Sequence, residues 1–459
     1  MAKKRIVTSV LAIVLIMGLL AGCVQSGPGA SGSTAQANNA AEDKADTGAA
    51  ADQPADSKAE IDTSKVNTDI KGDLTFWAWG DYEQNGAVDF NKYYPNVKIN
   101  WVMVPNFEEK LQATVASGSE LPDVVFMEIG RRASEMAMDL WENLEEAPYS
   151  FDRSQVVDWA IPLMENQRKE IVSVQWDMCQ CGLLYRRDLA KQYFGIEEPA
   201  DMEKMFPDWD TVIAKGKEVS DKSGGKVKLF AGSDDVFQAM SSKVTEPLVV
   251  DKKITFRDSY LEVFTAIEKM VKDNALGMDV QFSPSWNTSF SNGSAIFWPC
   301  PTWFIPWTLK PNDKNGNDMY GLMNMPGGSS SWGGTAGAIP KAKPDDKKKL
   351  AWTWISWLAL SNEGAKSFSR VNGVPTCYKP AAETPGFYGN SDPYFKGQNT
   401  IQKYLDMENI IIPPMTDYDQ TIENSALSSL RALDQGQSAQ QAFDVLMTEL
   451  KTKAPDLKE

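Results

Sequence analysis

The sequence contains no histidine among its 459 residues. This absence excludes zinc sites built on histidine ligands and hydrolases that use a Ser-His-Asp triad. Basic residues are also few relative to acidic ones, 46 against 62, which gives a formal net charge of −16. An acidic excess disfavours binding to nucleic acids and to anionic surfaces, but it carries no information about a neutral ligand.

Cysteine is rare, with five in the chain. One of them, Cys23, lies near the N-terminus, and the other four are Cys179, Cys181, Cys300 and Cys377. Four cysteines allow three disulfide pairings, and the sequence cannot choose among them.

The apolar run over residues 6–20 is too short for a membrane-spanning helix, which needs roughly 20 apolar residues. It follows three basic residues at positions 3–5 and ends in Leu-Ala-Gly before Cys23. This order predicts a signal peptide over residues 1–22. The end of the run resembles the lipobox of bacterial lipoproteins, in which the cysteine after the cleavage site is lipidated. A plain secretory signal followed by a chance cysteine is the alternative.

Residues 23–71 contain no aromatic side chain and consist mostly of small and charged residues. Such a segment buries too little apolar surface to offset the entropy of ordering it, so we predict a disordered tether behind the lipidated Cys23. The roughly 390 residues that follow exceed the size of a single hydrophobic core, which predicts two lobes.

Apolar strands alternate with helical segments through the rest of the chain, which favours an α/β fold built from βαβ units and a largely parallel sheet. Strands are expected at 74–79, 97–104, 124–127, 171–174, 182–185, 228–232 and 295–297. Helices are expected at 107–115, 261–274, 348–360 and 438–451.

A series of phrases in a fixed order resembles the family-1 extracellular solute-binding proteins, the group that contains the maltose- and oligosaccharide-binding proteins of ABC importers. The phrases are FWAWGD at 76–81, ATVASGSELPDVV at 113–125, GLLYRRDL at 182–189, FSNGSAIF at 290–297, WGGTAGAIPKA at 332–342, KKKLAWTWISWLALSNEGAKSF at 347–368 and NGVPT at 372–376. Together they extend over nearly all of the chain after the tether.

The resemblance implies a type II periplasmic-binding-protein-like fold, with two α/β lobes joined by hinge crossings and a ligand cleft between them. The first lobe would comprise residues 72–177 with 332–380, and the second residues 178–331 with 381–459. In such architectures the ligand lies where strand ends from both lobes meet, and closure is a hinge motion.

A carbohydrate site combines aromatic rings, which lie against the C–H face of a sugar, with polar groups that bind its hydroxyls. At the end of the first strand, Trp79, Asp81 and Tyr82 fit this requirement, and by resemblance Asp81 binds sugar hydroxyls. Trp77 and Trp79 alternate along the strand, so core packing is the alternative for both.

Glu128 and Arg131 follow the strand at 124–127, where members of the family place an aromatic and a charged pair on the sugar. Here Met127 stands in place of a tryptophan and Gly130 in place of an aspartate, which leaves the exact ligand open. A solvated charge pair is the alternative.

Asp177 precedes the first crossing between lobes and is a further candidate. Asp234 and Phe237 match an acidic and aromatic ligand contact of the family, although Asp234 could also cap a helix. Trp303 is the strongest candidate, because its distance from Gly293 matches the stacking tryptophan of the family, with Trp298 and Trp307 as nearby alternatives.

Three further candidates come from later crossings and loops: Trp332, Gly333 and Tyr418. Glycine at 333 would let the backbone approach a ligand closely. By contrast, Trp352, Trp354 and Trp357 lie on an expected helix and are predicted to pack in the core.

The sequence therefore predicts an extracytoplasmic, lipid-anchored solute-binding protein that delivers a carbohydrate, with an oligosaccharide as the expected form, to ABC transporter permease subunits. It is expected to be a monomer, to contact the membrane only through its lipid, to bind no nucleic acid and to need no cofactor or metal. A secreted glycoside hydrolase is the main alternative, because it would share the aromatic residues and carboxylates. A surface adhesin without a closable cleft is a third possibility.

Overall fold

The computed structural model describes residues 62–104, 106–128, 132–241, 244–389, 391–408, 410, 412 and 415–458. These residues fall within one compact unit, Ser57–Glu459. The predicted signal peptide, Cys23, the tether before residue 62 and Arg131 lie outside the described residues. Within the described part, no helix has the length and apolar character needed to cross a membrane.

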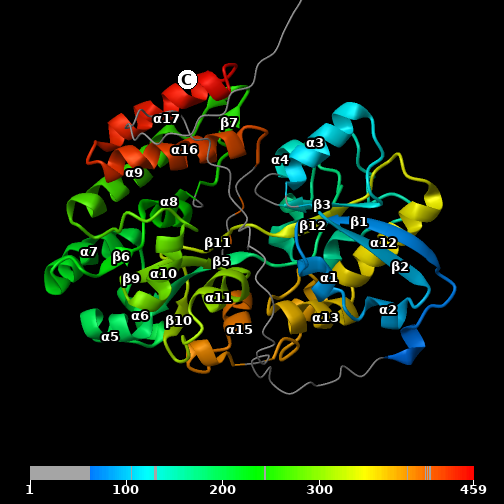
Figure 1. Cartoon of the computed structure of the whole chain (residues 1–459), viewed down its shortest axis with the longest axis horizontal. Helices are drawn as coiled ribbons and strands as arrows, with labels where there is room; N and C mark the ends of the chain where they lie inside the picture. The colour runs from blue at the N-terminus through cyan, green and yellow to red at the C-terminus, as the bar shows by residue number, and fades with distance from the viewer. Residues whose placement is uncertain are drawn as a thin grey trace, which may run out of the picture. The chain divides into compact units, whose positions relative to one another are not determined.

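The first of two five-stranded sheets has the order β2-β1-β3-β12-β4 (Figure 1). Its strands are β1 (Gly72–Ala78), β2 (Val97–Met103), β3 (Val124–Glu128), β4 (Val174–Gln175) and β12 (Thr335–Ala338). β1 runs parallel to β2 and β3, whereas β12 runs antiparallel to β3 and β4. Leu74, Phe76 and Ala78 of β1 have no exposed surface, so this strand forms the centre of a core.

Helices before and after the strands cover the first sheet: α1 (Tyr82–Gly86), α2 (Phe90–Tyr93), α3 (Phe107–Ser117), α4 (Arg132–Met136), α12 (Asp345–Ala359), α13 (Asn362–Asn372) and α14 (Lys379–Ala382). Short 3-10 turns lie at Thr63–Lys65, Arg153–Gln155 and Asp158–Leu163. Trp354 of α12 packs on Phe76 with ring centroids 4.7 Å apart. The predicted core position of the α12 tryptophans is confirmed for Trp354 and Trp357, which are buried.

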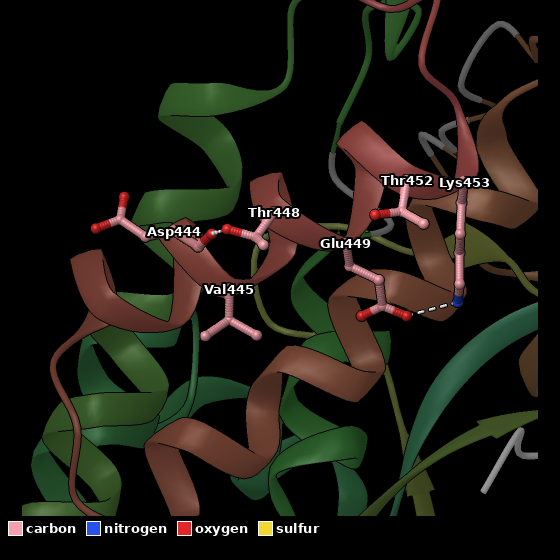
Figure 2. Close-up of a pocket in the computed structure, with 6 residues that line it drawn as sticks. All are labelled: Asp444, Val445, Thr448, Glu449, Thr452 and Lys453. Carbon is pink, nitrogen blue, oxygen red and sulfur yellow. Dashed lines mark hydrogen bonds and ion pairs between the residues drawn. The ribbon is translucent and has the colours of Figure 1, made fainter. Parts of the chain in front are cut away.

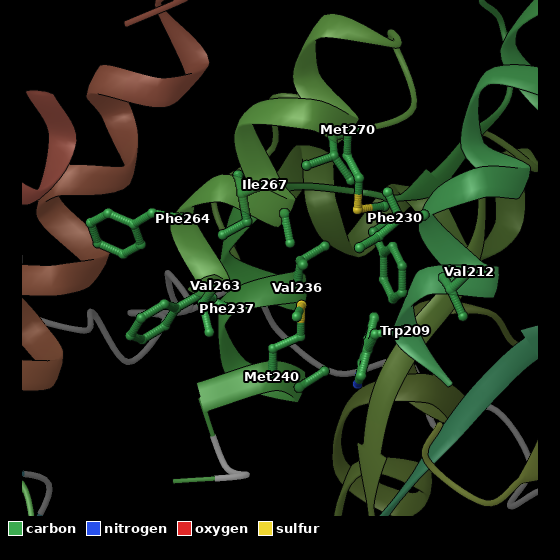
Figure 3. Close-up of a cluster of buried hydrophobic side chains, with 14 of the residues drawn as sticks. Trp209, Val212, Phe230, Val236, Phe237, Met240, Val263, Phe264, Ile267 and Met270 are labelled. Carbon is green, nitrogen blue, oxygen red and sulfur yellow. The ribbon is translucent and has the colours of Figure 1, made fainter. Parts of the chain in front are cut away.

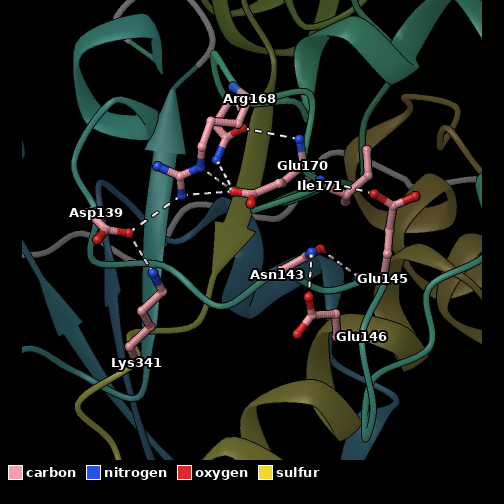
Figure 4. Close-up of polar contacts among 9 residues, drawn as sticks. Asp139, Asn143, Glu145, Glu146, Arg168, Glu170, Ile171 and Lys341 are labelled. Atoms are coloured by element: carbon pink, nitrogen blue, oxygen red, sulfur yellow. Dashed lines mark hydrogen bonds and ion pairs between the residues drawn. The ribbon is translucent and has the colours of Figure 1, made fainter.

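A long segment, residues 137–173, packs apolar residues such as Trp141, Leu144 and Ile171 in the core of the first sheet and carries polar contacts, most of them within the segment (Figure 4). Arg168 pairs with Glu170 at 2.8 Å, and Lys341, after β12, pairs with Asp139. Exposed ion pairs of this kind each contribute little to the free energy of unfolding.

The second sheet has the order β10-β5-β9-β6, with β11 also paired to β5. Its strands are β5 (Gln180–Arg186), β6 (Lys228–Phe230), β9 (Ala295–Pro301), β10 (Tyr320–Met323) and β11 (Ser330–Ser331), and β7 (Val249–Val250) forms a separate hairpin with β8 (Lys253–Ile254).

The prediction of a largely parallel arrangement is wrong for the second sheet. β5 runs antiparallel to β9, β10 and β11, and only β6 and β9 are parallel. The physical reason is that β5 enters directly from β4 of the first sheet instead of returning through a helical crossover, which is what makes neighbouring strands parallel.

The second sheet is surrounded by α5 (Arg187–Phe194), α6 (Pro199–Met205), α7 (Trp209–Ser223), α8 (Ser233–Ser241), α9 (Arg257–Lys272), α10 (Pro284–Asn292), α11 (Lys310–Asn312), α15 (Thr400–Leu405), α16 (Asp419–Asp434) and α17 (Ala439–Lys453). A π-helical turn, Ile305–Leu309, precedes α11, and a 3-10 turn spans Pro393–Phe395. Figure 1 shows α16 and α17 alongside α9.

Local sequence signals fix the ends of these helices. Asp208 caps α7 by accepting the Thr211 N–H at 2.8 Å, and Gly224 ends the helix in the left-handed conformation. In the core beneath α9, the rings of Trp209 and Phe230 stack 6.0 Å apart (Figure 3). Because α9 buries residues at helical spacing, its apolar face is the one that meets this core.

The four cysteines of the described chain are free and buried, so none of the three possible disulfide pairings forms.

Candidate ligand-binding site

Aromatic and polar side chains follow β1, at the carboxyl end of the first sheet. Trp79 is 50% exposed although Trp77, two residues earlier, is 8% exposed. Core packing, the alternative for both residues, therefore holds for Trp77 and not for Trp79, which lies beyond the end of β1 at Ala78. Asp81 is exposed before α1, and Tyr82 is partly buried within it. Trp79 and Asp81 are thus exposed after β1, whereas the Tyr82 ring makes T-shaped contacts with Trp307 and Phe368.

Asp177 lies where the chain passes from β4 to β5, and it ties several segments together. Its carboxylate accepts the Thr335 N–H at 2.7 Å and the Tyr82 hydroxyl at 3.2 Å, and its backbone bridges to Thr376. Burial is the main reason that the pKa of Asp177 is raised. Only 2% of the Asp177 surface is exposed in the ligand-free chain, and its direct contact with a ligand stays a prediction. Asp177 positions Tyr82 and the crossing segments, because its carboxylate oxygens accept hydrogen bonds from Tyr82 and Thr335.

Trp303 and Trp332 form the centre of an aromatic group at the second sheet. The Trp303 indole N–H donates to the Trp332 carbonyl at 2.9 Å, and their rings lie 5.3 Å apart in a T-shaped arrangement. Both side chains are partly buried. Gly333 has φ 79°, and a Cβ there would lie 2.8 Å from the Trp303 indole nitrogen. Glycine is therefore required at 333 both for the backbone conformation and for the approach of the ring.

Trp307 lies on the π-helical turn after Trp303 and contacts Tyr82, which follows the first strand of the first sheet. Its ring lies 5.5 Å from that of Tyr82 in a T-shaped arrangement, yet 47% of its surface is exposed. π-helical turns are rare and often mark functional positions. Trp307 thus contacts Tyr82 through its ring and Trp303 through its backbone N–H. The sequence names Trp307 only as a nearby alternative to Trp303.

Two predicted contacts are corrected by burial. Phe237 has no exposed surface and packs edge-on against Tyr260 at 5.4 Å, so it belongs to the core and is withdrawn as a ligand contact. Asp234 is 4% exposed, forms an ion pair with Arg431 and accepts the Gln281 N–H at 3.0 Å. Asp234 lies in the first turn of α8, where a carboxylate interacts favourably with the helix N-terminus, but its hydrogen-bond partners are Gln281 and Arg431. The sequence of α8 could not distinguish a ligand contact from a packing role, because acidic and aromatic residues occur in both.

Trp298, named as an alternative to Trp303, is also excluded as a contact. It is fully buried, and its indole N–H donates to Ser289 Oγ at 3.1 Å.

Glu128 ends β3 and is partly buried. It contributes to raising the pKa of Glu423 on α16 to about 7, although burial is the larger cause. The fully buried Arg132 lies nearby, and Arg131 is outside the described residues. Tyr418, just before α16, points its hydroxyl to Asp456 at 2.7 Å. Among the described contacts, nothing joins Tyr418 to the Trp303 group.

A shallow surface hollow lies on α17 and is lined by residues of that helix alone: Asp444, Val445, Thr448, Glu449, Thr452 and Lys453 (Figure 2). It has no aromatic lining, and Glu449 is paired with Lys453. This hollow lacks the ring surfaces that a sugar requires.

Two buried carboxyl groups near the site have strongly raised pKa values. Burial raises the pKa of Glu83, beside Tyr82, to about 8. Burial also raises the pKa of Asp235 to about 8, even though Asp235 accepts the Trp286 indole N–H at 3.0 Å. Both groups are therefore protonated in the folded chain at a pH where an unfolded chain has released the proton.

We expect the free energy of unfolding to fall as the pH rises between about 5 and 8. In this range the folded chain holds protons on Glu83 and Asp235 that the unfolded chain has lost, so rising pH favours the unfolded state. Thermal melting across the range should show the trend, and Asp235→Asn or Glu83→Gln should each flatten it. A melting temperature that climbs through this range, or an unchanged slope in both variants, would contradict the assignment.

Comparison with known proteins places this geometry in context. The sequence family described as "Bacterial extracellular solute-binding protein" matches residues 76–365. No curated protein sequence matches the chain. A solved structure described as an extracellular solute-binding protein of family 1 is 20% identical, with a TM-score of 0.73, and the match covers 83% of this chain and 99% of that one.

Two further solved structures share the fold. The GacH receptor of Streptomyces glaucescens GLA.O, studied unliganded and with acarbose, is 17% identical, with a TM-score of 0.65 over 85% of this chain and all of that one. An ABC transporter associated binding protein from B. animalis subsp. lactis Bl-04, in complex with β-1,6-galactobiose, is 16% identical, with a TM-score of 0.66 over 84% of this chain and 98% of that one. At these identities the likeness shows the two-lobe periplasmic-binding-protein fold.

Proposed function

Because the chain belongs to the bacterial extracellular solute-binding proteins, we propose that its solute is a neutral carbohydrate, captured for the permease of an ABC importer. The observation that carries this proposal is the set of accessible indole and phenol rings at the ends of both sheets. Trp79 and Tyr82 come from the first sheet, and Trp303 and Trp332 from the second. Such rings offer flat apolar faces to the C–H groups of a sugar.

Three carboxyl groups near the proposed site are occupied by contacts within the protein. Asp177, Asp234 and Asp235 are buried and hydrogen-bonded within the protein. A glycoside hydrolase needs two carboxyl groups facing each other across the scissile bond. The sugar complexes of structures with the same fold, with acarbose and with β-1,6-galactobiose, support the carbohydrate class for this chain.

We further propose that the two sheets mark two lobes, residues 72–177 with 332–380 and residues 178–331 with 381–459, that close on the ligand as a monomer. The crossing near Asp177 would be the hinge, since the chain passes there from β4 of the first sheet to β5 of the second. Closure needs a ligand that contacts both lobes, because only differential contact shifts such an equilibrium. Cys23 would hold the protein on the outer face of the cell membrane through its lipid.

Calorimetric titration with neutral mono- and oligosaccharides tests the ligand class. We expect one saccharide series to bind with an affinity that changes little between low and moderate salt, because ring stacking is not screened by ions. A steep loss of affinity with salt would instead indicate a charged ligand.

A further inference from the structure

The π-helical turn Ile305–Leu309 directs one large apolar side chain out of the core of the second sheet. Its two end residues, Ile305 and Leu309, are buried, but 47% of the Trp307 surface is exposed. The backbone N–H of Trp307 donates to the Trp303 carbonyl at 3.1 Å, so the turn is tied to the segment that carries Trp303. Trp307 therefore projects from a well-held backbone.

Tyr82, whose ring Trp307 contacts, is held firmly on the side of the first sheet. Its hydroxyl donates to Asp177 at 3.2 Å, and its ring meets that of Phe368 on α13 edge-on at 5.0 Å. A Cβ on Gly86 would clash with the Phe368 ring, so glycine at this position lets α1 pack closely on α13. Tyr82 thus offers a fixed surface to the second sheet's side.

The contact between Trp307 and Tyr82 joins the two proposed lobes. Their ring centroids lie 5.5 Å apart with an interplanar angle of 76°, within the roughly 4.5–7 Å at which edge-to-face rings attract. The chain crosses between the lobes beside Asp177, and a hinge rotation there changes the separation of the two rings. The contact therefore forms in one arrangement of the lobes and is lost in another.

We propose that Trp307 is a positioning residue that holds the lobes in the closed arrangement through Tyr82, and so raises the affinity for the solute without touching it. A contact that forms in only one state shifts the equilibrium toward that state, and a ligand that requires closed lobes then binds more tightly. One aromatic pair changes such an equilibrium about 2- to 12-fold. This inference rests on the two-lobe closure of the proposed function.

Distances between two spin labels test the contact directly. The labels are attached to Lys98→Cys on β2 and Lys226→Cys before β6, both exposed positions, in a chain with Cys23→Ala, because the four remaining cysteines are buried. Without sugar, Trp307→Ala should shift the label distances toward longer values, and Trp307→Phe, which keeps a ring, should restore them. Met278→Ala is the matched control, since this side chain is 69% exposed between α9 and α10, and it should leave the distances unchanged.

Calorimetric titration with maltotriose and with β-1,6-galactobiose gives the second readout. Trp307→Ala should weaken every sugar that binds by the same factor, about 2- to 12-fold, because the ring acts on the closure equilibrium and not on the sugar. Trp307→Phe should recover most of the lost affinity, whereas Met278→Ala should bind as the wild type does.

Label distances and affinities that both stay unchanged in Trp307→Ala would overturn the proposal. A loss of affinity that differs strongly between two sugars would also overturn it, since Trp307 would then touch the ligand. If the distances shift although neither sugar binds, the contact is supported and only the choice of ligand is wrong. Failure of the contact and failure of the proposed ligand class are thus told apart.

Discussion

Replacing Trp303 with alanine is expected to weaken carbohydrate binding roughly 30-fold or more, about 2 kcal/mol, as is typical of a central aromatic anchor. The ring is only partly buried in the ligand-free chain, and its indole N–H bonds to the Trp332 carbonyl. Truncation removes the stacking surface at the point where Trp332 and Phe282 converge. We therefore expect a modest change in the melting temperature beside the large loss of affinity, measured by calorimetric titration and thermal melting.

Trp298→Ala is the control, because it is expected to reduce stability strongly. Trp298 is fully buried, and removing a large core side chain costs about 3–5 kcal/mol of stability. Were Trp303→Ala to behave in the same way, with strongly reduced stability and intact affinity, Trp303 would be a packing residue. Trp307 or Trp332 would then be the better candidate for stacking.

Replacing Cys23 with alanine is expected to release the protein from the membrane fraction into the medium. Stable anchoring requires two or more acyl chains, which a lipidated cysteine supplies and an alanine cannot. The other four cysteines cannot replace it as acylation sites, because all are buried in the folded chain. Fractionation of cells after a salt wash measures the effect. A Cys23→Ala variant that remains with the membrane would contradict the lipoprotein assignment.

Local patterns were sufficient to predict the main elements of the fold. The apolar run after residue 73 forms β1, Gly72–Ala78, and the apolar run at 124–127 forms β3, Val124–Glu128. The expected helices at 348–360 and 438–451 are α12 and α17 with small shifts at their ends. These segments are long or strongly periodic, so local sequence dominates their structure.

Strand direction and side-chain exposure could not be predicted from local sequence patterns. The antiparallel setting of β5 depends on where the chain crosses between sheets, which is a long-range property. Phe237 and Trp307 are both aromatic residues near acidic or polar neighbours, yet one is fully buried and the other is 47% exposed. The positive φ of Phe282 could not be predicted either, because residue type does not indicate it.

The central claim is that this chain captures an oligosaccharide and releases it unchanged. The most direct test mixes the purified protein with maltotriose and β-1,6-galactobiose, isolates the complex by size exclusion, denatures it and identifies the released sugar by mass spectrometry. We predict recovery of one intact oligosaccharide per protein chain. Recovery of shortened sugars with new reducing ends would contradict the account.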